Sequence, residues 1–346
     1  MAICLVGTQW GYYLGTQMRR FYKGPLVVCG RDPQRTRQIA GRLGAKWIVG
    51  YEEAFSSPEI TAVILAVPAP LHLELGLAAI RRNKHVLIEK PLSLDLHGSD
   101  ALIAAARQEE IVLSVGENIP YRPAIRTARR LLPHIGERRL FFASSLRGAA
   151  RSGAETGILI DFSVHHIRAL RELFGEPDKV YAASAPAKEG GPSAGDNITL
   201  LLSSESGGWR ATLASSWQAS AGICPEFIVS GTRGAIKIWP DRFSVDLYPV
   251  EPGLLTKLIS RVRPSWLQQL LHSPEWPRRR FLFSPWDRMG YQSELRDFLR
   301  AVQRGLPDVS SALEARRDLE VAIAAEESLR SGHAVPCELE DQLQAA

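Results

Sequence analysis

A short apolar run that ends in two charged residues and a proline places the strongest constraint on this chain. Residues 86–88 are Val, Leu and Ile, which predicts a buried parallel strand. Glu89 and Lys90 follow, and Pro91 then excludes both ladder pairing and helix. Ligands of open α/β sheets bind at the carboxyl ends of the strands, so Lys90 would present an ammonium group there. The alternative is a solvated strand end without a chemical role.

Strand and helix alternate repeatedly over the first third of the chain. The other predicted strands are 2–6, 25–29, 62–67 and 111–115, and the clearest predicted helices are 71–82 and 96–108. This alternation predicts an α/β fold with a doubly wound parallel sheet.

The first strand leads into a glycine turn and then a helix-like segment that ends near residue 22. This is the context of a dinucleotide-binding turn, in which the helix N-terminus offers N–H groups and partial positive charge to a pyrophosphate. A GxGxxG pattern that begins at Gly7 would have glycines at 9 and 12, where the chain has Gln9 and Tyr12. The cofactor-binding candidates here are Gly7, Thr8, Gln9, Trp10 and Gly11.

The residues after the second strand favour NADP over NAD. An acidic residue at this position binds the 2′-hydroxyl of NAD, whereas arginine suits the 2′-phosphate of NADP. Gly30 removes side-chain bulk and charge, and Arg31 offers a bidentate donor for phosphate, with Arg35 one helical turn later. Asp32 keeps NAD open as the cofactor. Both arginines could instead be solvated residues at a helix start.

The carboxyl ends of two later strands complete the predicted cofactor site. Its remaining candidates are Val67, Pro68, His72, Glu89, Lys90 and Pro91. For His72, in the first turn of the helix over 71–82, a capping or packing role is favoured over a catalytic one.

Composition excludes several classes of protein. The chain has 346 residues, enough for two domains with substantial cores, and its charged residues amount to 23%. The net charge of +5 is mild and spread along the sequence, so it does not indicate nucleic-acid binding. Four separated cysteines without CxxC spacing predict neither a disulfide framework nor a metal site. With no evident signal peptide or membrane span, we expect a cytoplasmic protein without membrane contact.

The sequence changes in character from about residue 120. Short alternating strands are predicted at 140–146, 179–183, 197–202, 209–217, 226–229, 235–239 and 244–247. They predict a mainly antiparallel sheet. We therefore divide the chain into a nucleotide-binding domain, 1–118, and an α/β domain, 119–346, with two helices within 291–333. Residues 252–287, rich in Trp and Arg, are predicted to be an insertion that covers a sheet or contacts another subunit, with membrane-surface contact as the alternative.

A helix predicted over 158–174 carries the second candidate for chemistry. Its polar face consists of Asp161, His165, Arg168 and Glu172. Asp161 and His165 are neighbours at i,i+4, where a carboxylate can orient an imidazole and raise its basicity for general acid–base work. An exposed helix salt bridge is the alternative. His166 falls on the apolar side, which predicts a packed core histidine.

The chain resembles the family named after glucose–fructose oxidoreductase, inositol dehydrogenase and a rhizopine-catabolism protein (Gfo/Idh/MocA). The resemblance covers about residues 3–336 and includes HVLIEKPLSLDL (85–96), DFSVHHIRALRELFGEP (161–177), FIVSGTRGAIKI (227–238) and YQSELRDFLRAVQRG (291–305). It implies a Rossmann domain, then an α/β domain whose open, mainly antiparallel sheet forms a homodimer or homotetramer. It also implies NAD(P)-dependent oxidation of a hydroxyl, or reduction of a carbonyl, on a sugar, cyclitol or related small molecule.

By motif, Lys90 matches the family's active-site lysine, and Asp161 and His165 match its helix-borne pair. The corresponding lysine–proline peptide bond of the family is often cis, so the resemblance implies a cis bond between Lys90 and Pro91. In a physical account, His165 exchanges a proton with the substrate oxygen, Lys90 stabilises charge on it, and Asp161 holds the imidazole. Arg168, where an acidic residue is common in the family, could contact an anionic substrate group.

Two other functions stay open for this sequence. One is an enzyme in which tightly held NAD assists elimination or hydrolysis without net redox change. The other is a cofactor-binding partner or scaffold protein that has lost catalysis. Gln9 in the phosphate turn argues mildly for the latter, whereas Lys90, Asp161 and His165 argue against it.

Overall fold

The computed structural model describes residues 1–148, 157–184, 197–239, 244–249, 279–282 and 285–337. The chain forms two compact units. The first comprises Met1–Tyr121 and Gly290–Glu320, and the second comprises Arg122–Met289 and Val321–Ala346. The segment Gly290–Glu320 thus groups with the first unit, whereas the sequence analysis assigned the helices of 291–333 to the second domain.

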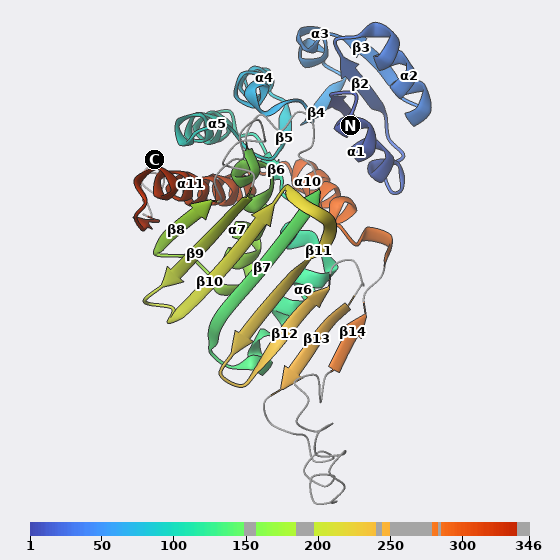
Figure 1. The fold of residues 1–346 in the computed structure, drawn as a ribbon. Coiled ribbons are helices and arrows are strands. Elements are labelled where there is room, and N and C mark those ends of the chain that lie inside the picture. Colours follow the sequence, from blue (N-terminus) through green and yellow to red (C-terminus); the bar gives the residue numbers. More distant parts are fainter. Residues whose placement is uncertain (149–156, 185–196, 240–243, 250–278, 283–284, 338–346) are drawn as a thin grey trace, which may run out of the picture. The chain divides into compact units, whose positions relative to one another are not determined.

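The first unit contains a six-stranded, wholly parallel sheet in the order β3-β2-β1-β4-β5-β6 (Figure 1). Its strands are β1 (Ala2–Val6), β2 (Leu26–Gly30), β3 (Lys46–Val49), β4 (Ile60–Leu65), β5 (His85–Glu89) and β6 (Leu113–Gly116). Its helices are α1 (Trp10–Arg19), α2 (Pro33–Leu43), α3 (Tyr51–Ser56), α4 (His72–Ile80), α5 (Leu96–Gln108) and α10 (Tyr291–Arg304), with 3₁₀ turns η1 (Ala69–Leu71) and η2 (Ile119–Tyr121). This strand order is that of the Rossmann fold, and it confirms the predicted doubly wound sheet.

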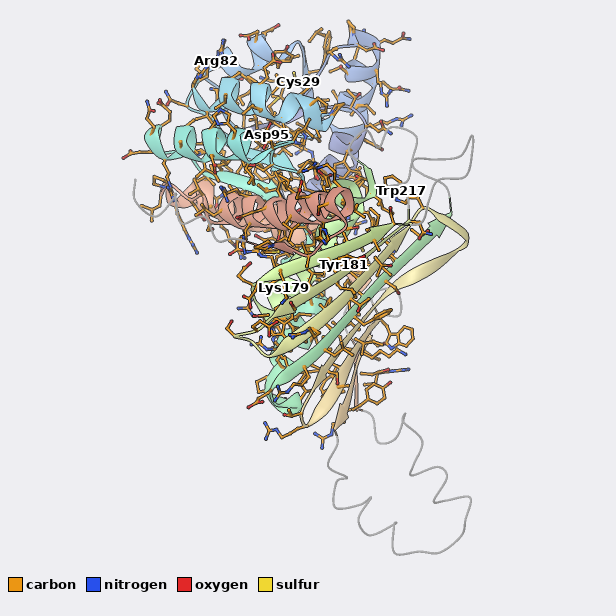
Figure 2. The ribbon with its side chains drawn as sticks, turned by 60° about the vertical axis from the view of Figure 1, so that its left-hand side comes forward. Cys29, Arg82, Asp95, Lys179, Tyr181 and Trp217 are labelled. Carbon is orange, nitrogen blue, oxygen red and sulfur yellow. The ribbon has the colours of Figure 1, made fainter. Side chains whose placement is uncertain are left out.

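Capping residues explain where two of these helices begin. The carboxylate of Asp32 accepts a hydrogen bond from the N–H of Arg35, and Pro33 opens α2 with a φ already suited to a helix. Asp95, labelled in Figure 2, caps α5 in the same way by accepting from the N–H of Gly98 at 2.6 Å.

The edge of the sheet contains a strand and a helix that the sequence analysis did not predict. β3 pairs only with β2, and its Trp47 is 45% exposed. Its apolar run, residues 47–49, is no longer than that of β5, and in a strand of four residues periodicity does not distinguish a strand from part of a helix. α3 is only six residues long, which is too short to show helical periodicity.

The second unit contains a nine-stranded sheet in the order β14-β13-β12-β11-β7-β10-β9-β8-β15. Its strands are β7 (Arg138–Gly148), β8 (Lys179–Ser184), β9 (Asn197–Ser204), β10 (Trp209–Ser216), β11 (Gln218–Gly231), β12 (Gly234–Trp239), β13 (Ser244–Pro249), β14 (Arg279–Leu282) and β15 (Val335–Pro336). β7 and β10 pair in parallel and the other pairs are antiparallel, as predicted for a mainly antiparallel sheet.

Helices cover one face of this sheet. α6 (Pro123–Leu131) and α7 (Val164–Phe174) pack against it, and Figure 1 shows both behind the strands. The short turns η3 (Leu132–Ile135), η4 (Leu159–Ser163) and η7 (Pro285–Asp287) and the long helix α11 (Ser310–Ser331) complete the described elements. Within the described ranges, no helix combines the length and apolarity needed to cross a membrane.

The packing of α1 on the first sheet generates a stability prediction. A methyl group on Gly15 would lie 2.6 Å from a Leu43 methyl and 2.8 Å from a Leu5 methyl, inside the core. We expect Gly15→Ala to lower the free energy of unfolding by about 1–2 kcal/mol, because overpacking outweighs the gain in helix propensity. The measurement is urea denaturation followed by circular dichroism.

Gly41 in α2 is the matched control. A Cβ atom there would meet nothing within 4 Å. Gly41→Ala should therefore raise the free energy of unfolding by up to about 1 kcal/mol. Equal effects of the two substitutions would contradict this description of the packing.

Candidate active site

Gly7 forms the turn between β1 and α1, and two independent constraints require glycine there. Its φ is +112°, a conformation that L-residues with a side chain rarely adopt. In addition, a Cβ atom on Gly7 would overlap the carbonyl oxygen of Ala66, directly after β4. The turn therefore lies directly against the end of β4, the strand that pairs with β1.

The N-terminus of α1 is open to an anion. The helix begins at Trp10, the preceding Gln9 makes no side-chain cap, and the first turn has no acidic residue. The first amides of a helix lack intrahelical partners, so they are available to a phosphate.

The departures from GxGxxG are compatible with this turn. Gln9 has a φ of −102°, which needs no glycine. The close helix–sheet approach that the third glycine normally provides is made by Gly11 and Gly15 instead of residue 12. Gly11 is buried, and a methyl group there would lie 3.6 Å from the Ala66 Cβ atom.

The end of β2 shows why residue 30 is glycine. A Cβ atom on Gly30 would overlap the hydroxyl of Thr36 and lie 2.9 Å from the Thr8 methyl. The Asp32 carboxylate is the reason why NAD remained an alternative cofactor. It accepts a hydrogen bond from the N–H of Arg35 at the start of α2. The Arg31 side chain is exposed, and it has no hydrogen-bond or ion-pair partner among the described residues.

His72 connects the ends of β4 and β5. Its Nδ1 lies 2.7 Å from the carbonyl oxygen of Pro91 and its Nε2 lies 3.0 Å from that of Val67, and the side chain is 1% exposed. Burial lowers the pKa of His72, as does the nearby charge of Lys90, while the two carbonyl contacts raise it. These contacts agree with the packing role that the sequence favours for His72, and a role in cofactor binding stays a prediction.

Lys90 follows β5 directly, and the Lys90–Pro91 peptide bond is cis, as the resemblance implied. The preceding carboxylate, Glu89, accepts a hydrogen bond of 2.7 Å from the indole Nε1 of Trp10. The pKa of Glu89 is raised to about 7, mainly by burial and also by the charge of Glu117. The Trp10 hydrogen bond and the Lys90 charge oppose this rise. No sequence pattern predicted the hydrogen bond between Trp10 and Glu89.

Asp161 and His165 lie in the second unit, at the start of its main helix. Asp161 belongs to the π-helical turn Leu159–Ser163, and His165 lies in the first turn of α7. Both are half-buried, in contrast to the buried apolar face of the helix. π-Helical turns within α-helices occur frequently at functional sites. The segment thus presents an acid and an imidazole on one accessible face.

Arg168 forms a salt bridge on the same face of the helix. Its guanidinium lies 3.5 Å from the carboxylate of Glu172, which also pairs with Arg129 at 2.7 Å. This salt bridge lies one turn beyond His165, and the alternative of a salt bridge between Asp161 and His165 stays open. The negative charge of Glu172 offsets part of the arginine charge that would otherwise disfavour an imidazolium.

His166 is a core histidine, as predicted. It is 1% exposed, its Nδ1 lies 3.4 Å from the Ser215 hydroxyl, and its ring makes edge contacts with Phe162 and Phe227.

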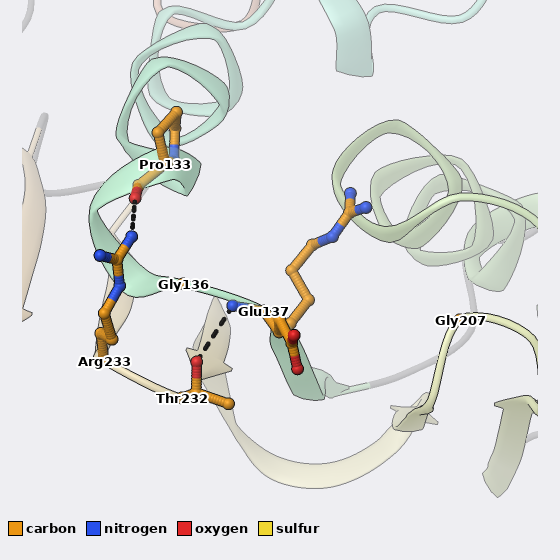
Figure 3. Close-up of a pocket in the computed structure, with 7 residues that line it drawn as sticks. Pro133, Gly136, Glu137, Gly207, Thr232 and Arg233 are labelled. Carbon is orange, nitrogen blue, oxygen red and sulfur yellow. Dashed lines mark hydrogen bonds between the residues drawn. The ribbon is translucent and has the colours of Figure 1, made fainter.

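A surface hollow elsewhere in the second unit contains none of the predicted site residues (Figure 3). Its polar groups hold a corner of the fold together. Arg233 donates to the Pro133 carbonyl at 3.0 Å, and the Glu137 N–H donates to the Thr232 hydroxyl at 3.1 Å.

Most of 252–287 lies outside the described residues, and so does the segment that leads to Asp161 before residue 157.

Comparisons with known proteins match both parts of the chain. Residues 2–117 match the model of an oxidoreductase family with an NAD-binding Rossmann fold, and residues 136–237 match the GFO/IDH/MocA C-terminal domain. These two segments make up more than half of the sequence. The chain therefore belongs to the Gfo/Idh/MocA family of oxidoreductases, as the resemblance implied.

Two of the curated relatives are a reductase and a dehydrogenase. The chain is 30% identical over 194 residues to dTDP-3,4-didehydro-2,6-dideoxy-alpha-D-glucose 3-reductase of Saccharopolyspora spinosa, covering 53% of this chain and 57% of that protein. It is 30% identical over 175 residues to scyllo-inositol 2-dehydrogenase (NAD(+)) of Bacillus subtilis (strain 168), covering 48% and 51%. The chain thus spans little more than half the length of these two relatives.

Solved structures share the fold over nearly the whole chain. Levoglucosan dehydrogenase in complex with NADH and levoglucosan has a TM-score of 0.80 at 20% identity, with 97% of this chain and 99% of that one covered. GenD2 from gentamicin A biosynthesis, in complex with NAD, has a TM-score of 0.78 at 22% identity, with coverage of 97% and 96%. These likenesses confirm the two-part α/β architecture.

Proposed function

We propose that this protein is an NADP-preferring oxidoreductase that transfers hydride between nicotinamide and a hydroxyl or carbonyl group of a sugar, cyclitol or related small molecule. The observation that carries the proposal is the position of Lys90 directly after β5, in the unit that also has the glycine turn and the open N-terminus of α1. The names of the family relatives, which act on sugars and cyclitols, support the substrate class.

In this proposal His165, Lys90 and Asp161 have separate roles in the reaction. A bound nicotinamide supplies or accepts the hydride. In the oxidative direction the C–H bond of the alcohol gives up that hydride and its O–H bond gives a proton to the imidazole of His165. Lys90 stabilises negative charge on the oxygen, and Asp161 orients the imidazole. In the reverse direction His165 returns the proton to the carbonyl oxygen.

The preference for NADP rests on three neighbouring residues. Gly30 cannot accept a hydrogen bond from a ribose hydroxyl through a side chain, and one oxygen of the Asp32 carboxylate accepts the N–H of Arg35 at the α2 cap. Arg31 is exposed beside them, with a guanidinium suited to a phosphate.

Arg31→Ala tests the cofactor preference. We expect the Kd for NADPH to rise about tenfold or more, because a charge-assisted contact to the 2′-phosphate is lost, while the weaker binding of NADH stays unchanged. Titration with both cofactors, followed by nicotinamide fluorescence, measures this. Arg37→Ala, an exposed arginine of the same helix region, is the control. Tighter binding of NADH than of NADPH by the unaltered protein would refute the preference.

Lys90→Ala and His165→Gln test the catalytic roles. With a substrate found by screening sugars, cyclitols and their ketones, we expect each to lower kcat by about 100-fold or more, because charge stabilisation or proton transfer is lost. His134→Gln, which alters an exposed histidine of the second unit, should leave kcat unchanged. Full turnover in Lys90→Ala would overturn the mechanism.

A reaction without net redox change is the second candidate. The chain is 26% identical over 246 residues to 2,7-anhydro-N-acetylneuraminate hydratase of Escherichia coli (strain K12), with 65% of each covered. A cofactor that co-purifies and returns to its starting redox state after turnover would favour this function over dehydrogenation.

We also propose that a second copy of this chain covers the face of the nine-stranded sheet opposite α6 and α7. Tyr181 on β8 (labelled in Figure 2) is 39% exposed, and its register partner on β9, Leu201, is 49% exposed. The same cross-strand row continues through Thr212 to Phe142 on β7, so apolar side chains recur along it. Exposed apolar rows of this kind are typical of subunit interfaces.

Leu201→Arg tests this interface. A charge at the centre of the row should convert a dimer or tetramer into smaller species, because it would be buried without a partner. Light scattering after size-exclusion chromatography measures the mass. Leu306→Arg, at a leucine that is 67% exposed in the first unit, is the control. A monomeric parent protein would contradict the proposal.

A further inference from the structure

Trp10 joins two places in the first unit that are 79 residues apart in sequence. It is the first residue of α1, and its indole Nε1 donates to the Oε1 of Glu89, the last residue of β5, at 2.7 Å. One hydrogen bond therefore connects the pyrophosphate end of the site with the strand that leads into Lys90.

The strand order identifies which half of a dinucleotide lies beside this bond. In a sheet of order 3-2-1-4-5-6, each half accommodates one mononucleotide, and the ribose that Arg31 would contact lies over the β1–β3 half. The nicotinamide half then corresponds to β4–β6. Glu89 and Lys90 are at the carboxyl end of β5, in the middle of that half.

Neighbouring residues hold the pair in place. The Trp10 ring stacks on Tyr13 with centroids 4.7 Å apart and meets the edge of Tyr291 at 5.7 Å. Gly116 is the register partner of Glu89 on β6, and a Cβ atom on it would lie 3.0 Å from the carboxyl carbon of Glu89. Glycine at 116 thus leaves room for the carboxylate, while the two tyrosines fix the indole.

The charge of Glu89 bears on the redox state of a bound cofactor. Oxidised nicotinamide is a cation and reduced nicotinamide is neutral, so a carboxylate nearby stabilises the oxidised form selectively. Lys90 has the opposite effect. We propose that Glu89, held by Trp10, sets the ratio of affinities for oxidised and reduced cofactor; this inference rests on the proposed function.

Titration of Glu89 makes the proposal testable. Its pKa of about 7 falls within the range of ordinary assays, and the groups that act on it are Trp10, Lys90 and Glu117. Above that pH the ionised carboxylate offsets the charge of Lys90 and favours NADP⁺. Below it the carboxyl is neutral, and NADPH is favoured. The 2′-phosphate is common to both forms and cancels in the ratio.

The experiment is calorimetric titration of the full chain with NADP⁺ and NADPH from pH 5.5 to 8.5. In the unaltered protein the ratio Kd(NADP⁺)/Kd(NADPH) should fall about fivefold as the pH rises through about 7. Glu89→Gln keeps a hydrogen-bond acceptor for the indole but has no charge. Its ratio should stay at the low-pH value throughout. Glu74→Gln, an exposed carboxylate of the same unit, should follow the unaltered protein.

Trp10→Phe supplies a second, independent measurement. The indole hydrogen bond lowers the pKa of Glu89, so its loss should move the midpoint of the pH dependence upward. A merely structural role for Trp10 would weaken both cofactors without moving that midpoint.

The outcomes separate this inference from the proposed function. If the unaltered protein binds neither NADP(H) nor NAD(H), both are overturned. Binding of both, with a ratio that is independent of pH and identical in Glu89→Gln, would overturn the inference alone and leave the oxidoreductase proposal intact.

Discussion

The close approach of one helix to one sheet determines the arrangement of the whole first unit. Gly7 lies against the Ala66 carbonyl, Gly11 lies beside the Ala66 Cβ atom, and Gly15 leaves room for the Leu5 and Leu43 side chains beneath α1. This contact brings the N-terminal amides of α1 to the carboxyl edge of the sheet, where β4 and β5 also end. A side chain at Gly7 would separate these groups, so the anion site and the lysine both depend on it.

Side chains then cross-link the strand ends at this edge. His72 contacts the carbonyl groups of Val67 and Pro91, and Trp10 bonds Glu89. The His72 side chain is buried and the Trp10–Glu89 bond is part-buried, so breaking either link costs more than breaking an exposed contact. Residues that flank Lys90 on both sides are therefore fixed before any ligand binds, which favours a preorganised site.

Sequence patterns predicted those strands and helices whose formation depends on residues close together in the sequence. Buried parallel strands are continuous apolar runs, so β1, β4 and β5 were found, and helix 96–108 agrees with α5. β3 was missed because its run of three apolar residues, 47–49, is too short for periodicity to identify a strand. The Trp10–Glu89 bond was missed because no periodicity relates residues 79 positions apart. The site residues themselves were chosen from motif matches, and their roles stay predictions.

The first unit is assembled from both ends of the chain, and this has a consequence for biosynthesis. Leu295, Phe298 and Val302 of α10 belong to the same apolar cluster as Ile3 and Leu5 of β1. A ribosome releases the sheet long before it makes α10, so the nascent sheet exposes apolar surface while the second unit is being translated. The nucleotide-binding unit can therefore be completed only after residues 122–289 and α10 have emerged.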